Sequence, residues 1–359
     1  NIAIGSNSLD DNTSGSQNVA IGRQALGDNT TSSNNTAIGY LTLKLNTTGT
    51  PNTAVGVEAL KTNTTGGHNV AVGNYALSLS TTASDNTAIG ANTLYENTTG
   101  TPNTAVGRNA LTNNTTGGMN TAVGAYSLDA NQTGSGNTCF GHNAGTAFTS
   151  DGITAVGKDA LELCTTGVNT AVGGNALAAV TTGTGNTAVG QDALTLNTGG
   201  YNTGIGAYAL DANTTASENT AVGYAALTAN TTGSFNVAVG LYALKENTTA
   251  NNNTAFGYKA LEDNTTGAHN VAIGYGTLDA NTTGQLNTAV GYNALTAQNS
   301  DAYNTAIGAN CMEKTTSGAN CAAVGRLALH ENTTGSQNTA LGYQSLYANT
   351  TGALSLIHI

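Results

Sequence analysis

The sequence predicts an all-β fold, a parallel β-solenoid of about 21 coils with a 17-residue repeat. The first supporting observation is the string N-T-A-V-G, whose closing glycine recurs 21 times from Gly5 to Gly342. The second is the constancy of the step, which is 17 residues except for the three steps of 16 that follow Gly141, Gly157 and Gly190. The third is that this period is too short for two packed helices, whose repeats need about 33 residues or more.

Each repeat contains segments of two kinds. N-T-A-V-G is short and β-rich, with period-2 alternation, and predicts a strand. The N-T-T-G string found later in most repeats is typical of a turn, because Gly adopts positive φ and Asn bonds its own backbone. We therefore expect strand, bend, short second strand and turn in each coil, with the coils stacked about 4.8 Å apart.

Stacking places equivalent side chains above one another. The residue before the marker glycine and the leucine four residues after it are expected to form two apolar ladders that point into a narrow core between two sheets. These ladders are represented by Val55, Val72 and Ile89 and by Leu60, Leu77 and Leu94. The asparagines four residues before the glycine are expected to bond amide to amide, as stacked asparagines do in cross-β structure, and are therefore interpreted as structural. They include Asn52, Asn69 and Asn86.

Ala54 and Val55 lie on opposite faces of the predicted strand, and both positions are apolar in the repeats. Small apolar residues on both faces indicate that both faces are covered. We expect one face to pack inside the coil and the alanine face to pack against a second copy of the chain. The sequence therefore predicts a homo-oligomer.

Composition excludes several classes of protein. The chain has 359 residues, only 8% of them charged, with a formal net charge of −11. The acidic balance argues against a nucleic-acid partner, because phosphate binding needs clustered Lys or Arg. The sequence has no run of about 18 apolar residues, so no membrane insertion of this segment is expected.

The residue types that carry chemistry do not form a recognisable motif. The four cysteines occupy different positions of the coil and lack C-x-x-C spacing, which argues against zinc and predicts buried free thiols. They are Cys139, Cys164, Cys311 and Cys321. The histidines show no i,i+4 pair, and the carboxylates fall in variable or turn positions. We therefore expect no enzyme activity, no metal site and no cofactor.

Two sets of residues are candidates for surface contacts. Tyrosines directly after the marker glycine would form an outward stripe suited to multivalent contact, or they are surface filler. They are Tyr224, Tyr258, Tyr275 and Tyr292. The coil between Gly141 and Gly157 is the most irregular, with Gly145 in place of Leu and Ile153 in place of Asn. This coil is either a shorter variant or a contact site around His142, Phe148 and Asp151.

The repeat resembles known surface fibres. The segments Asn1–Gly5 and Asn287–Leu295 are similar to the head repeats of YadA-like trimeric autotransporter adhesins and to repeats of bacterial and phage tail-fibre-like proteins. The resemblance extends to Gly352. It implies a left-handed parallel β-roll, a homotrimeric fibre, and attachment to a host-surface protein or glycan receptor. It also implies an extracellular location, at the bacterial cell surface or on a virion tail.

The end of the chain departs from the repeat. Residues 1–352 are expected to form a single repeat array, truncated at both ends. Residues 353–359 read A-L-S-L-I-H-I, of which the last six resemble the translation of a sequencing adapter, so this segment is set apart from the fold prediction.

The function expected from these observations is that of a non-enzymatic structural fibre or adhesin segment that mediates attachment to surfaces. One alternative is an ice-binding solenoid, because threonines such as Thr47 and Thr48 recur as ladders beside the turns. The other is a glycan-cleaving tailspike that uses paired carboxylates, for which Asp151 and Asp159 are the residues to alter.

Overall fold

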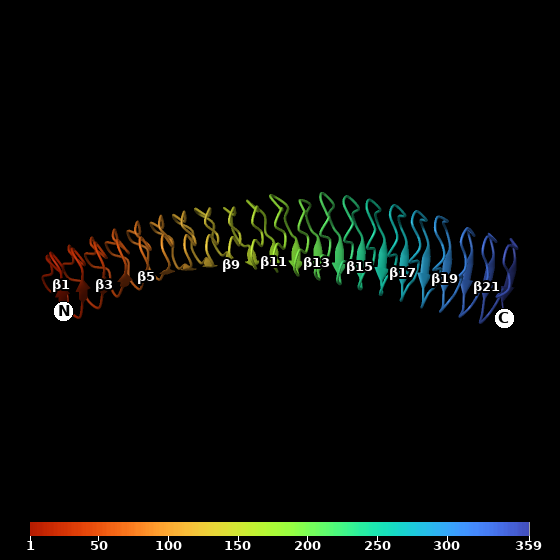
Figure 1. Ribbon diagram of the computed structural model, residues 1–359, viewed down its shortest axis with the longest axis horizontal. Helices are drawn as coiled ribbons and strands as arrows, with labels where there is room; N and C mark the ends of the chain where they lie inside the picture. The colour runs from red at the N-terminus through yellow and green to blue at the C-terminus, as the bar shows by residue number, and fades with distance from the viewer. Residues whose placement is uncertain (359) are drawn as a thin grey trace. The chain divides into compact units, whose positions relative to one another are not determined.

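The computed structural model describes residues 1–358 and confirms an all-β parallel solenoid of about 21 coils with a 17-residue repeat. It contains no helix among these residues. The chain forms two compact units, Asn1–Thr182 and Gly183–Ile359, which are built from the same coil. Each coil contributes one three-residue strand to the same side of its unit (Figure 1).

The strands of the first unit pair with their sequence neighbours in parallel, as in Ile2↔Val19 and Thr154↔Thr170. The register therefore advances by one repeat, and equivalent side chains stack. The strands are β1 (Ile2–Ile4), β2 (Val19–Ile21), β3 (Thr36–Ile38), β4 (Thr53–Val55), β5 (Val70–Val72), β6 (Thr87–Ile89), β7 (Thr104–Val106), β8 (Thr121–Val123), β9 (Thr138–Phe140), β10 (Thr154–Val156) and β11 (Thr170–Val172).

The second unit repeats this arrangement, with Thr220 opposite Val237 and Ala221 opposite Ala238. Its strands are β12 (Thr187–Val189), β13 (Thr203–Ile205), β14 (Thr220–Val222), β15 (Val237–Val239), β16 (Thr254–Phe256), β17 (Val271–Ile273), β18 (Thr288–Val290), β19 (Thr305–Ile307), β20 (Ala322–Val324), β21 (Thr339–Leu341) and β22 (Leu356–His358). The last strand lies in the segment set apart by its sequence, and it pairs with β21 in the same register. Ile359, the final residue of that segment, lies outside the described residues.

The predicted second strand of each coil is wrong. The Ala-Leu segment forms turns, because its leucine adopts a left-handed conformation, with φ of 54° at Leu227 and 52° at Leu60. An extended strand cannot include such a residue. Backbone hydrogen bonds still join this segment to the next coil, as from Leu227 N–H to the Ala243 carbonyl at 3.0 Å. The wall opposite the sheet is therefore a stack of turns.

The predicted orientation of the strand is also wrong. The central alanine, not the residue before the glycine, points into the core: Ala54 and Ala71 are fully buried, whereas Val55 is partly exposed. The coil is too thin to hold a larger side chain opposite the buried leucine. At Gly204, which replaces the alanine, an added Cβ would already lie 3.2 Å from Leu194 Cδ1. Alanine and leucine together fill the interior, and the Val/Ile position faces outward.

The marker glycine is required by close stacking. Gly56 has φ of +135°, and a Cβ there would lie 2.4 Å from the Gly73 carbonyl oxygen of the next coil. No side chain is compatible with that contact, which explains why the position is glycine in all 21 copies.

The asparagine ladder predicted from the sequence is confirmed. Asn52, Asn69 and Asn86 are buried, and the side-chain amide of Asn69 donates to Asn52 Oδ1 at 3.1 Å. The asparagines that open N-T-T-G form a second buried ladder, in which Asn63 donates to Asn46 Oδ1 at 2.8 Å. These bonds satisfy polar groups that the thin core would otherwise leave unpaired.

The irregular coil after Gly141 is repacked with apolar side chains. Phe148 and Ile153 occupy asparagine positions of the two ladders, and they are 0% and 1% exposed. Gly145 replaces the core leucine, and a Cβ there would lie 2.9 Å from Ile153 Cδ1. The larger side chains therefore fill the space that the leucine leaves, and the interpretation as a shorter variant coil agrees with this packing.

Candidate binding surfaces

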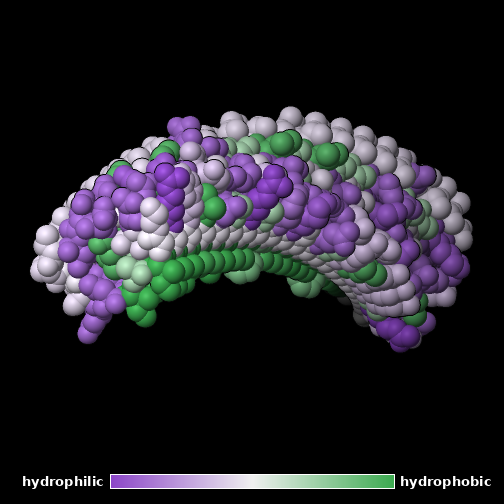
Figure 2. Space-filling view, turned by 60° about the vertical axis from the view of Figure 1, so that its left-hand side comes forward, coloured by the Kyte–Doolittle hydropathy of each residue, from purple (hydrophilic) through white to green (hydrophobic). Residues whose placement is uncertain are grey.

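The outer face of the sheet is the most regular exposed feature. The residue before the marker glycine is apolar in each repeat and points outward, with exposed fractions of 41% at Ile89, 55% at Phe256 and 52% at Leu341. The first residue of each strand, most often Thr, lies on the same face two positions away. Figure 2 shows hydrophobic residues gathered in a band on the side that carries the strands. Each unit therefore presents a column of Val and Ile beside a column of Thr.

The four tyrosines named in the sequence analysis lie on the outward turn after the glycine, and each ring contacts a tyrosine ring of a neighbouring coil, or rung, of the stack. Tyr275 stacks on Tyr258 and on Tyr292, with ring centroids 5.0 and 5.3 Å apart. Tyr224 makes edge contacts with Tyr208 and Tyr242. In the stacked set, each tyrosine ring covers a face of the ring on the neighbouring coil, so the ring edges and hydroxyls are the parts mainly left exposed.

The structure separates the two other contact candidates. His142 is on the surface, 3.9 Å from the Asp159 carboxylate and edge-on to Tyr126. Phe148 is fully buried and so is not a surface residue. A contact site built from these two residues is therefore wrong, because the phenyl ring fills the core of its own coil.

The carboxylates named for a glycan-cleaving site serve local structure. Asp151 Oδ1 accepts a hydrogen bond from Ser135 N–H at 2.6 Å. Burial raises the pKa of Asp159, but hydrogen bonds from Lys158 and Asn143 outweigh it and hold the pKa below its usual range. A general acid for glycan cleavage needs a raised pKa, so the charge state of Asp159 is unsuited to that role.

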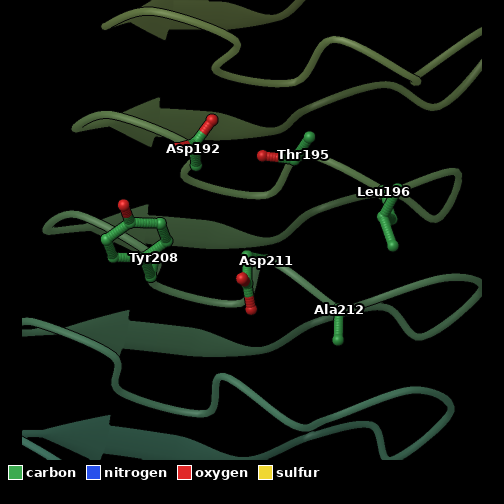
Figure 3. Close-up of a pocket in the computed structure, with 6 residues that line it drawn as sticks. All are labelled: Asp192, Thr195, Leu196, Tyr208, Asp211 and Ala212. Atoms are coloured by element: carbon green, nitrogen blue, oxygen red, sulfur yellow. The ribbon is translucent and has the colours of Figure 1, made fainter.

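A shallow pocket of about 300 Å³ lies between two rungs of the second unit (Figure 3). Asp192, Thr195 and Leu196 come from one rung, and Tyr208 and Asp211 come from the next; Ala212 completes the lining. The Asp211 carboxylate accepts a hydrogen bond from the Thr228 hydroxyl at 2.7 Å. The pocket includes none of the seven residues that the sequence analysis named as candidates for surface contacts.

A further exposed column was missed by sequence reasoning. It consists of the residues five positions before each marker glycine, most of which adopt left-handed φ values, such as 59° at Tyr201 and 61° at Phe235. Several of these side chains are large, apolar and more than half exposed, namely Met119, Val168, Tyr201, Phe235 and Tyr303. A left-handed conformation costs a non-glycine residue about 1–2 kcal/mol, so bulky side chains here are unfavourable for folding alone. Their only signal in the sequence is variation at this position.

The four thiols are buried and free, as predicted. Burial raises the pKa of Cys139 and of Cys311 to about 12, and that of Cys164 to about 11. No group of three or more His, Cys, Asp or Glu residues within 1–358 is arranged to hold a metal ion. The thiols are therefore packing residues with low reactivity.

Comparison with known protein families and with curated proteins gave no match to the chain. In the described part of the chain, no helix is long and apolar enough to cross a membrane.

Proposed function

We propose that this chain is a segment of a non-enzymatic fibre that associates with copies of itself and attaches to surfaces. The observation that carries the proposal is the outward column of Val and Ile, an apolar surface repeated at each rung. Large continuous apolar patches on the surface of a soluble protein mark interaction sites. A homotrimer around one long axis would cover this column along its whole length.

The internal hydrogen bonding suits such a rod. The hydroxyl of the first threonine in N-T-T donates to the next coil, as from Thr47 to the Thr64 carbonyl at 3.0 Å. Threonine side chains that bond to the next coil are unavailable for ligands. Contacts with a host protein or glycan are therefore expected from the variable, outward-facing positions. The resemblance of the repeat to adhesins and tail fibres supports an extracellular role, at a bacterial surface or on a virion tail.

The proposal is tested by the mass of the protein in solution. We expect the wild-type chain to have the mass of three copies in multi-angle light scattering. The variant Val222→Glu/Val239→Glu/Phe256→Glu places charges on adjacent rungs of the outer column and should be a single copy. The control Thr215→Glu/Thr232→Glu/Thr249→Glu places the same charges on exposed turn positions and should remain three copies. A monomeric wild-type chain would contradict the proposal.

The same face favours one second candidate, ice binding. Threonines of the outer face of the sheet lie opposite one another on successive strands, as in the pairing of Thr104, Thr121 and Thr138, rather than only beside the turns. Under this alternative, the wild-type chain is monomeric and shows thermal hysteresis that the triple Glu variant of the outer column lacks. A trimer without hysteresis eliminates it.

A further inference from the structure

From Tyr201 to Tyr303, the second unit carries aromatic side chains at every second rung of one exposed column. They are Tyr201, Phe235, His269 and Tyr303, each five residues before a marker glycine and each 34 residues from the next. Tyr201, Phe235 and Tyr303 are 65%, 53% and 58% exposed, and His269 is also exposed. The intervening rungs carry Glu218, Asn252 and Leu286 at the same position.

Each aromatic residue is fixed to the rung before it. Its backbone N–H donates to a carbonyl 17 or 18 residues earlier, at 2.9 Å from Tyr201 to Thr184 and at 3.1 Å from His269 to Asn251. The Tyr201 ring also lies against Gly185, where an added Cβ would be 2.7 Å from Tyr201 Cδ1. The backbone that carries each ring is therefore held at a fixed spacing by the stack.

Folding does not explain the choice of residue. The backbone here is left-handed, with φ of 59–65° at the four aromatic rungs, and such positions favour Asn or Gly. Elsewhere in the chain this column does contain those residues, as at Asn34, Gly136 and Asn252. Bulky rings that face solvent from this conformation are therefore best explained by contact with a ligand.

The spacing identifies the class of ligand. Two rungs correspond to about 9–10 Å along the stack. In an extended chain of β-1,4-linked pyranoses each sugar is turned over relative to the next, so the same apolar face returns at every second sugar, at nearly this distance. An extended peptide repeats over a shorter distance, since two residues span about 6.6–6.8 Å.

The neighbouring column supplies polar groups. One position earlier in the sequence, Ser234 precedes Phe235, and Ser217 and Asn251 precede the intervening residues Glu218 and Asn252. Ser234 Oγ accepts from Ser217 N–H at 3.1 Å, and Asn251 Oδ1 accepts from Ser234 N–H at 2.6 Å. The Ser234 hydroxyl and the Asn251 side-chain amide are thereby held in the column next to the rings, on either side of Phe235, as donors to sugar hydroxyls. The net charge of −11 disfavours a polyanionic glycan.

We propose that the column Tyr201–Phe235–His269–Tyr303 binds a neutral, extended β-1,4-linked glycan, one ring to every second sugar. The proposal deepens the proposed function, since it rests on attachment to surfaces and names the chemistry that is bound. Four weak stacking contacts on one chain add by avidity.

The test is calorimetric titration of the whole chain with cellohexaose, with chitohexaose and, as the control ligand, with α-1,4-linked maltohexaose. We expect binding of at least one β-1,4-linked ligand and at least tenfold weaker binding of maltohexaose. The variant Tyr201→Ser/Phe235→Ser/His269→Ser/Tyr303→Ser should lose at least tenfold in affinity. The matched variant Glu218→Ser/Asn252→Ser/Leu286→Ser/Asn320→Ser alters the three intervening rungs and the rung after Tyr303, and it should stay within twofold of wild type.

A further variant tests whether affinity depends on the spacing of the rings and not only on their number. Tyr201→Glu/Glu218→Tyr/Phe235→Asn/Asn252→Phe keeps the composition of the column but moves two rings by one rung. We expect it to bind more weakly than wild type, because the distance to His269 then no longer matches two sugars. Equal affinity of this variant, equal binding of maltohexaose, or no binding of either β-1,4-linked ligand would overturn the inference. The solution mass of the same samples tests the proposed assembly separately, so the two failures are distinguishable.

Discussion

The side-chain oxygen of Asn52 accepts two hydrogen bonds from Asn69, one from the backbone N–H at 3.0 Å and one from the side-chain amide at 3.1 Å. Asn69 in turn accepts the backbone N–H of Asn86 at 3.1 Å. Each asparagine side chain thus accepts the backbone N–H that lies directly before the strand of the next coil. Except where Ile153 and Cys321 replace asparagine, the ladder adds hydrogen bonds between coils beyond those of the three-residue strand.

Substitution of one ladder asparagine should expose specific backbone groups of its own coil and the next to solvent. Asn69→Ala removes the acceptor of the Asn86 N–H and the donor to the Ala83 carbonyl, both of which are buried. Leaving buried polar groups unpaired costs about 1–3 kcal/mol each. We expect faster hydrogen exchange of the Asn86 amide, with little change in the remote coils. The control Thr65→Ala alters an exposed side chain of the same coil and should leave the exchange rate of the Asn86 amide unchanged. An unchanged exchange rate of this amide in the Asn69→Ala variant would contradict the role of Asn69 as its hydrogen-bond acceptor.

Because adjacent strand residues face opposite sides of the sheet, the buried one must be small and the outward one can be larger. Ala221 is fully buried against the leucine wall, and Val222 is partly exposed on the outer face. We expect Ala221→Leu to destabilise its coil by about 1–3 kcal/mol through overpacking. Val222→Leu should change stability by less than about 0.5 kcal/mol. Urea-gradient hydrogen exchange of the two variants measures this difference in stability. Equal destabilisation by both substitutions would contradict the assignment of Ala221 to the core and Val222 to the outer face.

The failure to predict this orientation has a physical origin. The period identifies one rung, and the alternation of Ala221 and Val222 places them on opposite faces, but both are apolar. Which one faces inward depends on the thickness of the coil, and that follows from the left-handed turn at Leu227, which no residue pattern indicates because leucine seldom adopts that conformation. The asparagine ladders were predictable because stacking follows from the period alone. The aromatic column was not, because variable positions have the same appearance whether they bind a ligand or only face solvent.

Loss of one core leucine should have a local effect. Leu227→Ala removes a fully buried side chain and should cost about 2–5 kcal/mol. In a stack of coils with nearest-neighbour coupling, this loosens one coil and its neighbours. Far-UV circular dichroism should remain near wild type, and hydrogen-exchange mass spectrometry should localise the change around β14 and β15. Loss of all structure would contradict the modular energetics.

Asp279 should make the second unit less stable at neutral pH than in mild acid. Burial, together with the charges of Asp263 and Glu262, raises the pKa of this carboxyl to about 6. Because the folded pKa lies above the unfolded value of about 3.9, the folded form binds the proton more tightly, and stability falls as pH rises from about 4 to 6. The side chain is partly exposed, so solvent screening limits the effect to the order of 1 kcal/mol. Asp279→Asn should raise the melting temperature at pH 7 and flatten its dependence between pH 4 and 6; an unchanged slope would show that the group titrates normally.

The buried thiols report which coils open. Burial holds the pKa of Cys164 at about 11 and that of Cys311 at about 12, so both should react slowly with iodoacetamide at pH 8 and rapidly in denaturant. Leu161 is fully buried in the same coil as Cys164, whose N–H donates to the Leu161 carbonyl at 3.2 Å. Leu161→Ala should therefore accelerate alkylation of Cys164 and leave Cys311, in the other unit, as protected as in wild type. Peptide mass spectrometry after timed labelling measures both sites in one sample. Parallel acceleration at both cysteines would mean that the chain opens as a whole, and stacking would then be cooperative over its full length rather than from rung to rung.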